Sequence, residues 1–391
     1  MKKKSGWLAV FFILMSCSTS NNSVIQETAP YISEPASRII EQPPAEAHEE
    51  IHEETTSIQQ VKEEPVMVYY EGQLLNIFFH PLIARPQTAF NSSHRAHFLE
   101  WYVTAGEYRK ILYELYINDY VLVDIKELYE VGYSGGRKTV TYKKPLIPAG
   151  KKPLVLSVDD LNYYDFVREN ASVDKLIIDA DGNIAALTGN EISYDLDIVT
   201  YTEVFIKENP DFSIRGAKGI IALTGYEGVL GYHTHKGYEG VMGNPTRYLS
   251  SPEYLEEKAN ATAVANRLKE LGWHFASHSW GHPNLPNISM AWFTNDKNRW
   301  EREVRPILGE TDLYIYPFGA GVEHIEERHR LLRELNFNVF FGVGAGLGCR
   351  EGQGYIYMDR RNIDGVYFRL FRNRADRLFD IDKVIDAQAR R

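Results

Sequence analysis

The segment "HSWGH" carries the residues best suited to chemistry. His278 and His282 lie four positions apart, directly after the apolar run "WHFAS". Side chains at this spacing face the same way on one turn of a helix, and two histidines so placed are common metal ligands. The same pattern fits a helix start that carries two histidines by chance. Residues elsewhere in the chain have to decide between these interpretations.

A pair of carboxylates ends another apolar run, "PLVLSVDD". Asp159 and Asp160 could cap a following helix. Two adjacent carboxylates repel each other, however, and a metal that binds one and leaves the other as a base removes that difficulty. One carboxylate and two imidazoles form the 2-His-1-carboxylate set, which leaves coordination positions for water and substrate. We therefore predict a metal centre of Asp160, His278 and His282.

The elements that must position these residues are apolar strands separated by helices. Thr104 and Glu107 form a capping box at the start of one helix, and another runs from Ser251 to Gly272. Continuous apolar strands favour a mainly parallel sheet, and their number favours a closed or nearly closed β/α barrel with its site at the C-terminal ends of the strands. An open doubly wound sheet is the alternative. The predicted strands lie in LLNIFFHPLI, PLVLSV, KGIIALTG, WHFASH, DLYIYPFG, NVFFGVG and GVYFRLF.

The N-terminus predicts export and lipid attachment. A lysine-rich start precedes an apolar run from Trp7 to Met15, too short for an ordinary membrane-spanning helix, and the run ends in a sequence that resembles a bacterial lipobox. Residues 1–17 are therefore predicted to be a lipoprotein signal peptide, cleaved before Cys17, whose lipidated thiol anchors the protein to the membrane of the cell envelope, outside the cytoplasm. An ordinary signal peptide with a chance cysteine is the alternative.

Composition separates a stalk from a folded domain and excludes some functions. Residues 18–66 are rich in Glu, Pro, Ser and Thr and predict a disordered acidic linker, whereas residues 67–391 form the predicted barrel domain. The net charge of −10 gives no sign of nucleic-acid binding. With only two cysteines a disulfide framework is excluded, and Cys349 is predicted to be a small core residue.

Three motifs at strand ends resemble those of the polysaccharide deacetylase family, carbohydrate esterase family 4. "SVDD" is similar to its Thr-Phe-Asp-Asp motif, "HSWGH" to its His-Ser-x-x-His motif, and "YPFG" to the end of its Arg-x-Pro-Tyr/Phe-Gly motif. The resemblance covers roughly residues 75–370. It implies a distorted β/α barrel. The region from 165 to 250 is longer than a plain barrel connection, and we predict a rim insertion that shapes the substrate groove.

The resemblance also implies a role for each site residue. Asp160, His278 and His282 would hold a divalent metal, zinc, and Asp159 would be the general base for an attacking water. The backbone N–H of Phe318 would face the oxyanion. Ser279 would orient the loop through hydrogen bonds. The residues predicted to contact substrate are Tyr163, Trp280 and Pro317, and Tyr164 also flanks the site. The three aromatic rings could equally be buried support for the loops.

Two departures from the family pattern leave roles open. Ile315 stands where the family has an arginine beside the base, and Arg360 or Arg361 could supply that guanidinium, or could form a surface ion pair. The late Leu-x-His motif that supplies the general acid is also absent. Candidate acids are His80, at the end of a strand, and His233 and His235, in a glycine-rich loop; each could instead be a core or solvated histidine.

The predicted function is removal of acetyl groups from an N-acetylated or O-acetylated cell-envelope or extracellular polysaccharide by a metal-activated water. A non-catalytic glycan-binding lipoprotein with the same fold and metal site is one alternative, motivated by Ile315 and the missing late histidine. A metal-dependent amidohydrolase acting on peptides or small amides is another, because it needs the same ligands.

Overall fold

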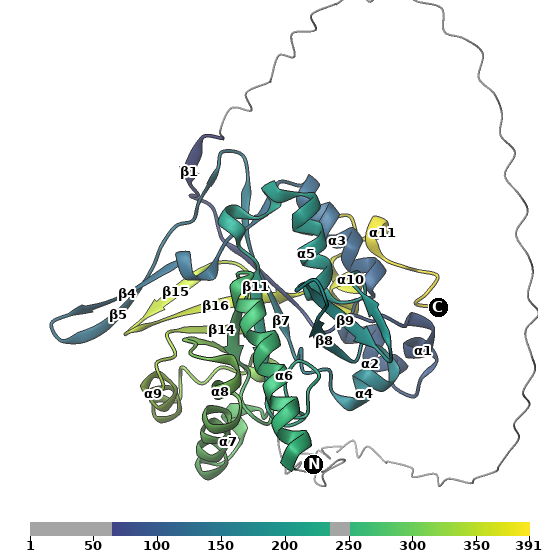
Figure 1. Ribbon diagram of the computed structural model, residues 1–391. Coiled ribbons are helices and arrows are strands. Elements are labelled where there is room, and N and C mark those ends of the chain that lie inside the picture. Colours follow the sequence, from purple (N-terminus) through teal and green to yellow (C-terminus); the bar gives the residue numbers. More distant parts are fainter. Residues whose placement is uncertain (1–64, 235–250) are drawn as a thin grey trace, which may run out of the picture. The chain divides into compact units, whose positions relative to one another are not determined.

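The computed structural model describes residues 65–234 and 251–391 (Figure 1). The chain divides into the units Met1–Lys62 and Glu63–Arg391, and the second contains every element described below. The predicted signal peptide with Cys17, nearly all of the predicted linker, and His235 lie outside the described residues. Within the described residues, no helix has the length and apolar character needed to span a bilayer.

Seven parallel strands close into a barrel, which confirms the predicted fold class and excludes the open sheet. The strands run in the order β11-β12-β13-β14-β16-β2-β7, and pairing of β7 with β11 closes the ring. The barrel is distorted, since β12 and β13 pair only through Ser277 and Tyr314. The bounds are β2 (Leu75–Phe79), β7 (Lys152–Asp159), β11 (Gly219–Leu223), β12 (His274–Ser277), β13 (Leu313–Ile315), β14 (Val339–Val343) and β16 (Tyr355–Asn362).

Alternation along each strand separates the barrel interior from the helix-covered outside. On β7, Leu154, Leu156 and Val158 belong to the large core cluster beneath the helices, whereas Val155 belongs to a second cluster. That second cluster also takes residues of β11, β13, β14 and β16 and fills the barrel. Since side chains alternate with period two, Asp159 on β7 shares the inward phase of Val155. The inward-facing side chains of β7 therefore change from the apolar Val155 to the acidic Asp159 at the end of the strand.

Helices pack around the barrel in groups that Figure 1 shows on different sides of it. The predicted capping box is present, with Glu107 N–H donating to Thr104 Oγ1, and the helix predicted from Ser251 is also present. The main helices are α3 (Ala105–Ile117), α5 (Ile198–Glu208), α6 (Ser251–Glu270), α7 (Met290–Glu303), α8 (Arg305–Leu308), α9 (Glu326–Glu334) and α11 (Ile381–Val384).

The remaining strands lie outside the closed ring. β3 (Tyr120–Leu122) pairs with β7, and β15 (Cys349–Gly352) pairs antiparallel with β16. The bounds of the others are β1 (Met67–Tyr69) with β6 (Leu146–Pro148), and the hairpin β4 (Tyr129–Ser134) with β5 (Arg137–Tyr142). Burial raises the pKa of the Cys349 thiol to about 12, so this half-buried cysteine is a poor nucleophile.

One predicted strand is wrong, and one barrel strand was missed. The segment "GVYFRLF" is a helix, α10 (Gly365–Phe371), because the Asp364 carboxylate accepts the Tyr367 N–H and caps it. Aromatic residues are common in strands, but here the Asp364 cap favours a helix. The last barrel strand is instead β16, whose run of Asp359, Arg360 and Arg361 hides the apolar alternation of the residues before it.

The region from 165 to 250 is not a single rim insertion. The barrel strand β11 lies inside it, so the described part forms one connection before β11 and the start of another after it. The first connection contains α4 (Asp165–Asn170), a three-stranded antiparallel sheet and α5. The sheet strands are β8 (Lys175–Ile178), β9 (Ile184–Thr188) and β10 (Glu191–Ser193).

Candidate active site

The proposed site residues gather where the barrel strands end. Asp159 ends β7, His278 directly follows β12, and Phe318 lies in a turn after β13. The left-handed backbone region, which is disfavoured for residues with a side chain, occurs at Asp160, Ser279, His282 and Phe318, with φ between 51° and 59°. Strain concentrated at strand ends in this way is typical of sites whose side chains must point in set directions.

His278 and His282 are not on a helix, contrary to the argument from their spacing. Both lie in the loop after β12, which turns back at Ser279 and again at His282. The Ser279 Oγ accepts the His282 N–H at 3.0 Å, which fits the orienting role predicted for this serine. The loop therefore brings the two imidazoles together, with ring centroids 4.8 Å apart.

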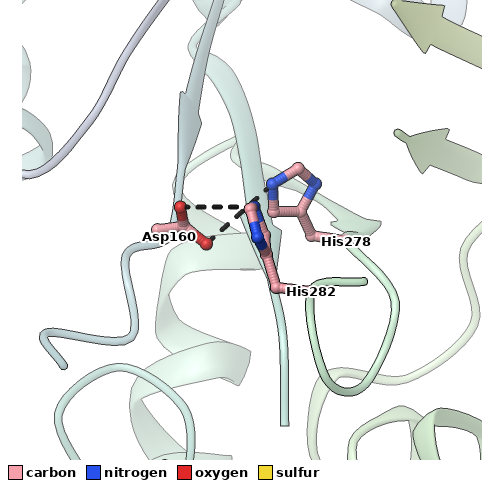
Figure 2. A group of neighbouring side chains, drawn as sticks. All are labelled: Asp160, His278 and His282. Atoms are coloured by element: carbon pink, nitrogen blue, oxygen red, sulfur yellow. Dashed lines mark ion pairs between the residues drawn. The ribbon is translucent and has the colours of Figure 1, made fainter. Parts of the chain in front are cut away.

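Asp160, His278 and His282 form a group that could hold a metal ion, and their side chains face one another in Figure 2. Asp160 Oδ1 lies 3.9 Å from His278 Nε2, and Asp160 Oδ2 lies 3.8 Å from His282 Nε2. Two ligands that each bind zinc at roughly 2.0–2.2 Å can be no more than about 4.4 Å apart, so both of these separations fit a shared ion. Among the described residues this is the one such group of histidines, cysteines and carboxylates.

Hydrogen bonds fix the orientation that a ligand set requires. His278 Nδ1 lies 2.8 Å from the Ile315 carbonyl oxygen, so Nδ1 carries the proton and Nε2 is left free to face Asp160. Asp296 on α7 holds the loop between the histidines, because its carboxylate accepts the N–H groups of Trp280 at 2.9 Å and Gly281 at 2.7 Å.

The electrostatics favour the protonation states that bind metal. Burial raises the pKa of Asp160, but His282, His278 and His80, together with a hydrogen bond from Tyr164, outweigh burial and hold that pKa below its usual range. Burial lowers the pKa of His282 to about 4, although Asp160 opposes the shift. A carboxylate and a neutral imidazole are the forms that coordinate a cation.

The His282 shift can be measured directly. In the metal-free protein the ring resonances of His282 should titrate near pH 4, because burial disfavours the charged imidazolium. Since the unfolded chain binds this proton more readily, the stability due to His282 is present above the ordinary pKa of 6.5 and is lost as pH falls towards about 4. Histidine-ring NMR over a pH series checks the titration, and denaturant unfolding over the same pH series checks the stability. A midpoint near 6.5 would contradict the burial argument.

Arg360 supplies the guanidinium that Ile315 cannot. Its Nη1 and Nη2 donate to Asp159 Oδ1 at 2.6 Å and Oδ2 at 2.8 Å, and Nη1 also donates to Ser157 Oγ. Burial raises the pKa of Asp159, but Arg360 and then His278 outweigh it and keep the pKa below the usual range. Arg361 contacts the carbonyls of Ala345 and Asp376 instead.

A cavity of about 460 Å³ opens over this group. Phe318, exposed to 66%, and Trp101, exposed to 39%, both line it. Much of its wall comes from aromatic residues and His97. The positions of these residues in the sequence did not indicate a site. Tyr164, which flanks the predicted site in sequence, also lines the cavity, and the lining residues not predicted are Phe78, His97, Trp101, Tyr102, Phe166, Tyr226, Gly319, Val343 and Asn362.

Of the candidate acids, His80 lines the cavity. It follows β2, whose Phe79 pairs with Val158 of β7, so the register places His80 beside Asp159. Its Nδ1 lies 3.1 Å from the Trp101 carbonyl oxygen. His233 is not among the lining residues; its Nε2 lies 3.4 Å from Arg168 Nη2.

Tyr163 and Trp280, two of the predicted substrate contacts, are buried, as expected if their rings support the loops. Tyr163 is exposed to 1% and its hydroxyl donates to Asp197 Oδ2, and Trp280 is exposed to 3% and donates to Glu303 Oε2. Pro317 is also buried and does not line the cavity, so it positions the neighbouring Phe318. None of these three residues lines the cavity, so the structure gives no support to the prediction that they contact substrate.

Comparison with known proteins finds a similarity over part of this barrel. Residues 246–339 match the family model described as polysaccharide deacetylase, a segment that contains His278, His282 and Phe318 but not Asp159, Asp160 or Arg360. Residues 246–339 are therefore similar to a polysaccharide deacetylase domain, which supports the predicted family and the predicted enzyme class, a deacetylase. No curated protein matches the chain.

Solved structures with a related arrangement are distant in sequence. A Streptococcus pyogenes deacetylase, PplD, in complex with acetate has 15% identity and a TM-score of 0.42, over 77% of this chain and 94% of that chain. A polysaccharide deacetylase from Bacillus cereus has 11% identity and a TM-score of 0.42, over 82% of this chain and 69% of its own. The strand pairing described above defines the fold.

Proposed function

We propose that the protein is a metal-dependent hydrolase that removes acetyl groups from an N-acetylated or O-acetylated polysaccharide of the cell envelope or the extracellular space. The observation that carries this proposal is the placement of Asp159, locked by Arg360, beside the group of Asp160, His278 and His282 at the base of one cavity. A non-catalytic binding protein would not need a second buried carboxylate fixed next to the first.

The donor set fits zinc. Two imidazole nitrogens and one carboxylate suit that ion and leave positions open for water and substrate. A bound zinc ion would polarise the acyl oxygen and lower the pKa of water towards neutrality. The residues proposed to hold it are Asp160, His278 and His282.

Asp159 is proposed to accept the proton of the attacking water. Both of its oxygens accept hydrogen bonds from Arg360, which keeps the carboxylate ionised and fixes its plane. Each oxygen retains a further lone pair for a water molecule. The low pKa makes Asp159 a weak base, so its contribution depends on orientation and on negative charge near the attacking oxygen. The N–H of Phe318 is proposed to donate to the oxyanion.

His80 is proposed to be the general acid that protonates the leaving amine. Its Nδ1–H donates to the Trp101 carbonyl, so Nε2 is left for the cavity, and His80 acts as the acid in its imidazolium form, which carries a second proton on Nε2 and gives it to the amine. The exposed rings of Trp101 and Phe318 at the cavity offer surfaces on which sugar rings could stack.

The proposed location is the bacterial cell envelope, outside the cytoplasm, with a lipid anchor at Cys17. This rests on the sequence of residues 1–17. Incorporation of an alkyne-tagged fatty acid should label the protein in cells and should be lost in Cys17→Ser; labelling that persists in this variant would exclude the anchor.

Acetate release tests the proposed activity. The zinc-loaded protein should release acetate from N-acetylated oligosaccharides or acetylated envelope fragments, and a chelator should abolish release until zinc is restored. Coupled detection of acetate and of free amine measures the reaction and separates N- from O-deacetylation. Glycan binding without acetate release under any metal would favour the non-catalytic alternative. Faster release from acetylated peptides than from any glycan would favour the amidohydrolase.

A further inference from the structure

Arg390, the residue before Arg391, packs its side chain against the turn that ends α2 (Arg95–Trp101). Its side chain is exposed to 9% and pairs with Glu107, which is exposed to 0%. Arg390 Nε donates to Glu107 Oε1 at 2.6 Å and Nη2 to Glu107 Oε2 at 2.8 Å. A buried pair of this kind is retained only where its geometry is well satisfied.

The same guanidinium binds two carbonyls at the end of α2. Arg390 Nη1 donates to the Leu99 oxygen at 3.1 Å, and Nη2 donates to the Tyr102 oxygen at 2.8 Å. Carbonyls at the end of a helix have no partner within the helix, and a cation there is favoured by the helix dipole. Glu107 completes the clamp, because its Oε2 also accepts the Thr104 N–H.

Between these two carbonyls lies the one that orients His80. The Trp101 oxygen is 3.1 Å from His80 Nδ1, and Tyr102 packs beside the His80 ring with centroids 5.5 Å apart. Arg390 therefore fixes the backbone on both sides of the single carbonyl that determines which His80 nitrogen faces the cavity.

We propose that Arg390 is a positioning residue for His80: by clamping the Leu99–Tyr102 turn, it holds the Trp101 carbonyl where it orients His80 for proton transfer to the leaving group. This inference rests on the function proposed above. Arg390 touches neither the cavity nor the metal-binding group, so it acts only through the turn.

The experiment compares two substrates that differ in their need for an acid. An N-acetylated oligosaccharide expels an amine that must be protonated, whereas 4-nitrophenyl acetate expels a phenolate that leaves without a proton. With the zinc-loaded full chain, Arg390→Gln should lower kcat on the oligosaccharide by about tenfold or more, part of the 10²–10⁴-fold that a general acid contributes. Hydrolysis of the aryl ester should change by less than about twofold, because that leaving group needs no acid.

A double variant tests whether the effect passes through His80. In a His80→Ala background, Arg390→Gln should produce no further loss on the oligosaccharide, since the group that it positions is gone. Arg391→Gln, at the neighbouring exposed arginine, is the matched control and should leave both substrates unchanged. Equal losses on both substrates, an unchanged oligosaccharide rate, or additive losses with His80→Ala would each overturn the proposal.

A paired variant guards against misfolding. Because Arg390→Gln alone leaves Glu107 buried without a countercharge, Glu107→Gln with Arg390→Gln removes both charges together. This variant should fold, bind zinc stoichiometrically and show the same selective loss; a full oligosaccharide rate in it would contradict the inference. Failure of the wild-type protein to release acetate from any glycan would instead contradict the proposed function.

Discussion

Asp160→Ala and His278→Ala should each remove both the bound zinc and the deacetylase activity. Each variant deletes one of three atoms that can reach a common ion. Losing the ion removes several kcal/mol of stabilisation of the developing negative charge, which corresponds to roughly a 10³-fold or greater fall in kcat/KM. The zinc content of purified protein and acetate release under saturating zinc measure the two effects.

A surface histidine provides the control for this prediction. His324 is exposed and belongs to no group of potential ligands among the described residues, so His324→Ala should keep both zinc and activity. Excess zinc should restore His278→Ala only in part, since two ligands hold the ion weakly. Stoichiometric zinc and an undiminished rate in Asp160→Ala would show that the catalytic ion, if any, lies elsewhere.

The ligand residues could be predicted from sequence, but their local structure could not. Asp160, His278 and His282 stood out because each follows an apolar run, and parallel strands bring such ends to one rim. The helical spacing of the histidines was misleading, because the loop after β12 reaches the same proximity through left-handed residues such as Ser279. Backbone reversals at non-glycine residues leave no clear sequence signal.

Long-range contacts explain what the sequence left open. Arg360 and Arg361 are neighbours with the same chemistry, and only the strand register decides that Arg360 faces into the barrel towards Asp159. The aromatic lining from α2 and α4 was not predicted, because residues such as Trp101 and Phe166 enter the site through packing between distant segments. Tyr163 follows one motif and Trp280 lies within another, yet both are buried and neither lines the cavity, so proximity in sequence does not predict a place in the cavity wall.

Arg360→Met should impair both stability and catalysis. The variant leaves the Asp159 carboxylate buried without its partner, which should lower the free energy of unfolding by roughly 3–5 kcal/mol at neutral pH. It should also lower kcat by about 10²-fold, because an Asp159 that is protonated or misoriented cannot take a proton from water. Denaturant unfolding and acetate release measure the two effects.

In Arg360→Met, the contribution of Asp159 to the pH dependence of stability should change sign. In the wild-type protein Arg360 keeps the pKa of Asp159 below its ordinary value of 3.8, so this contribution to stability is present at neutral pH and is lost as pH falls through the lowered pKa. Without Arg360, burial raises that pKa, and the variant should instead lose stability as pH rises through the raised value. Asp159→Asn combined with Arg360→Met should recover stability but not activity, because no buried charge remains and no base is restored. Arg361→Met is the control: it leaves Asp159 paired with Arg360, so the contribution of Asp159 to the pH dependence of stability should stay as in the wild-type protein. An Arg360→Met protein with wild-type stability across this pH range would mean that the ion pair does not hold the base.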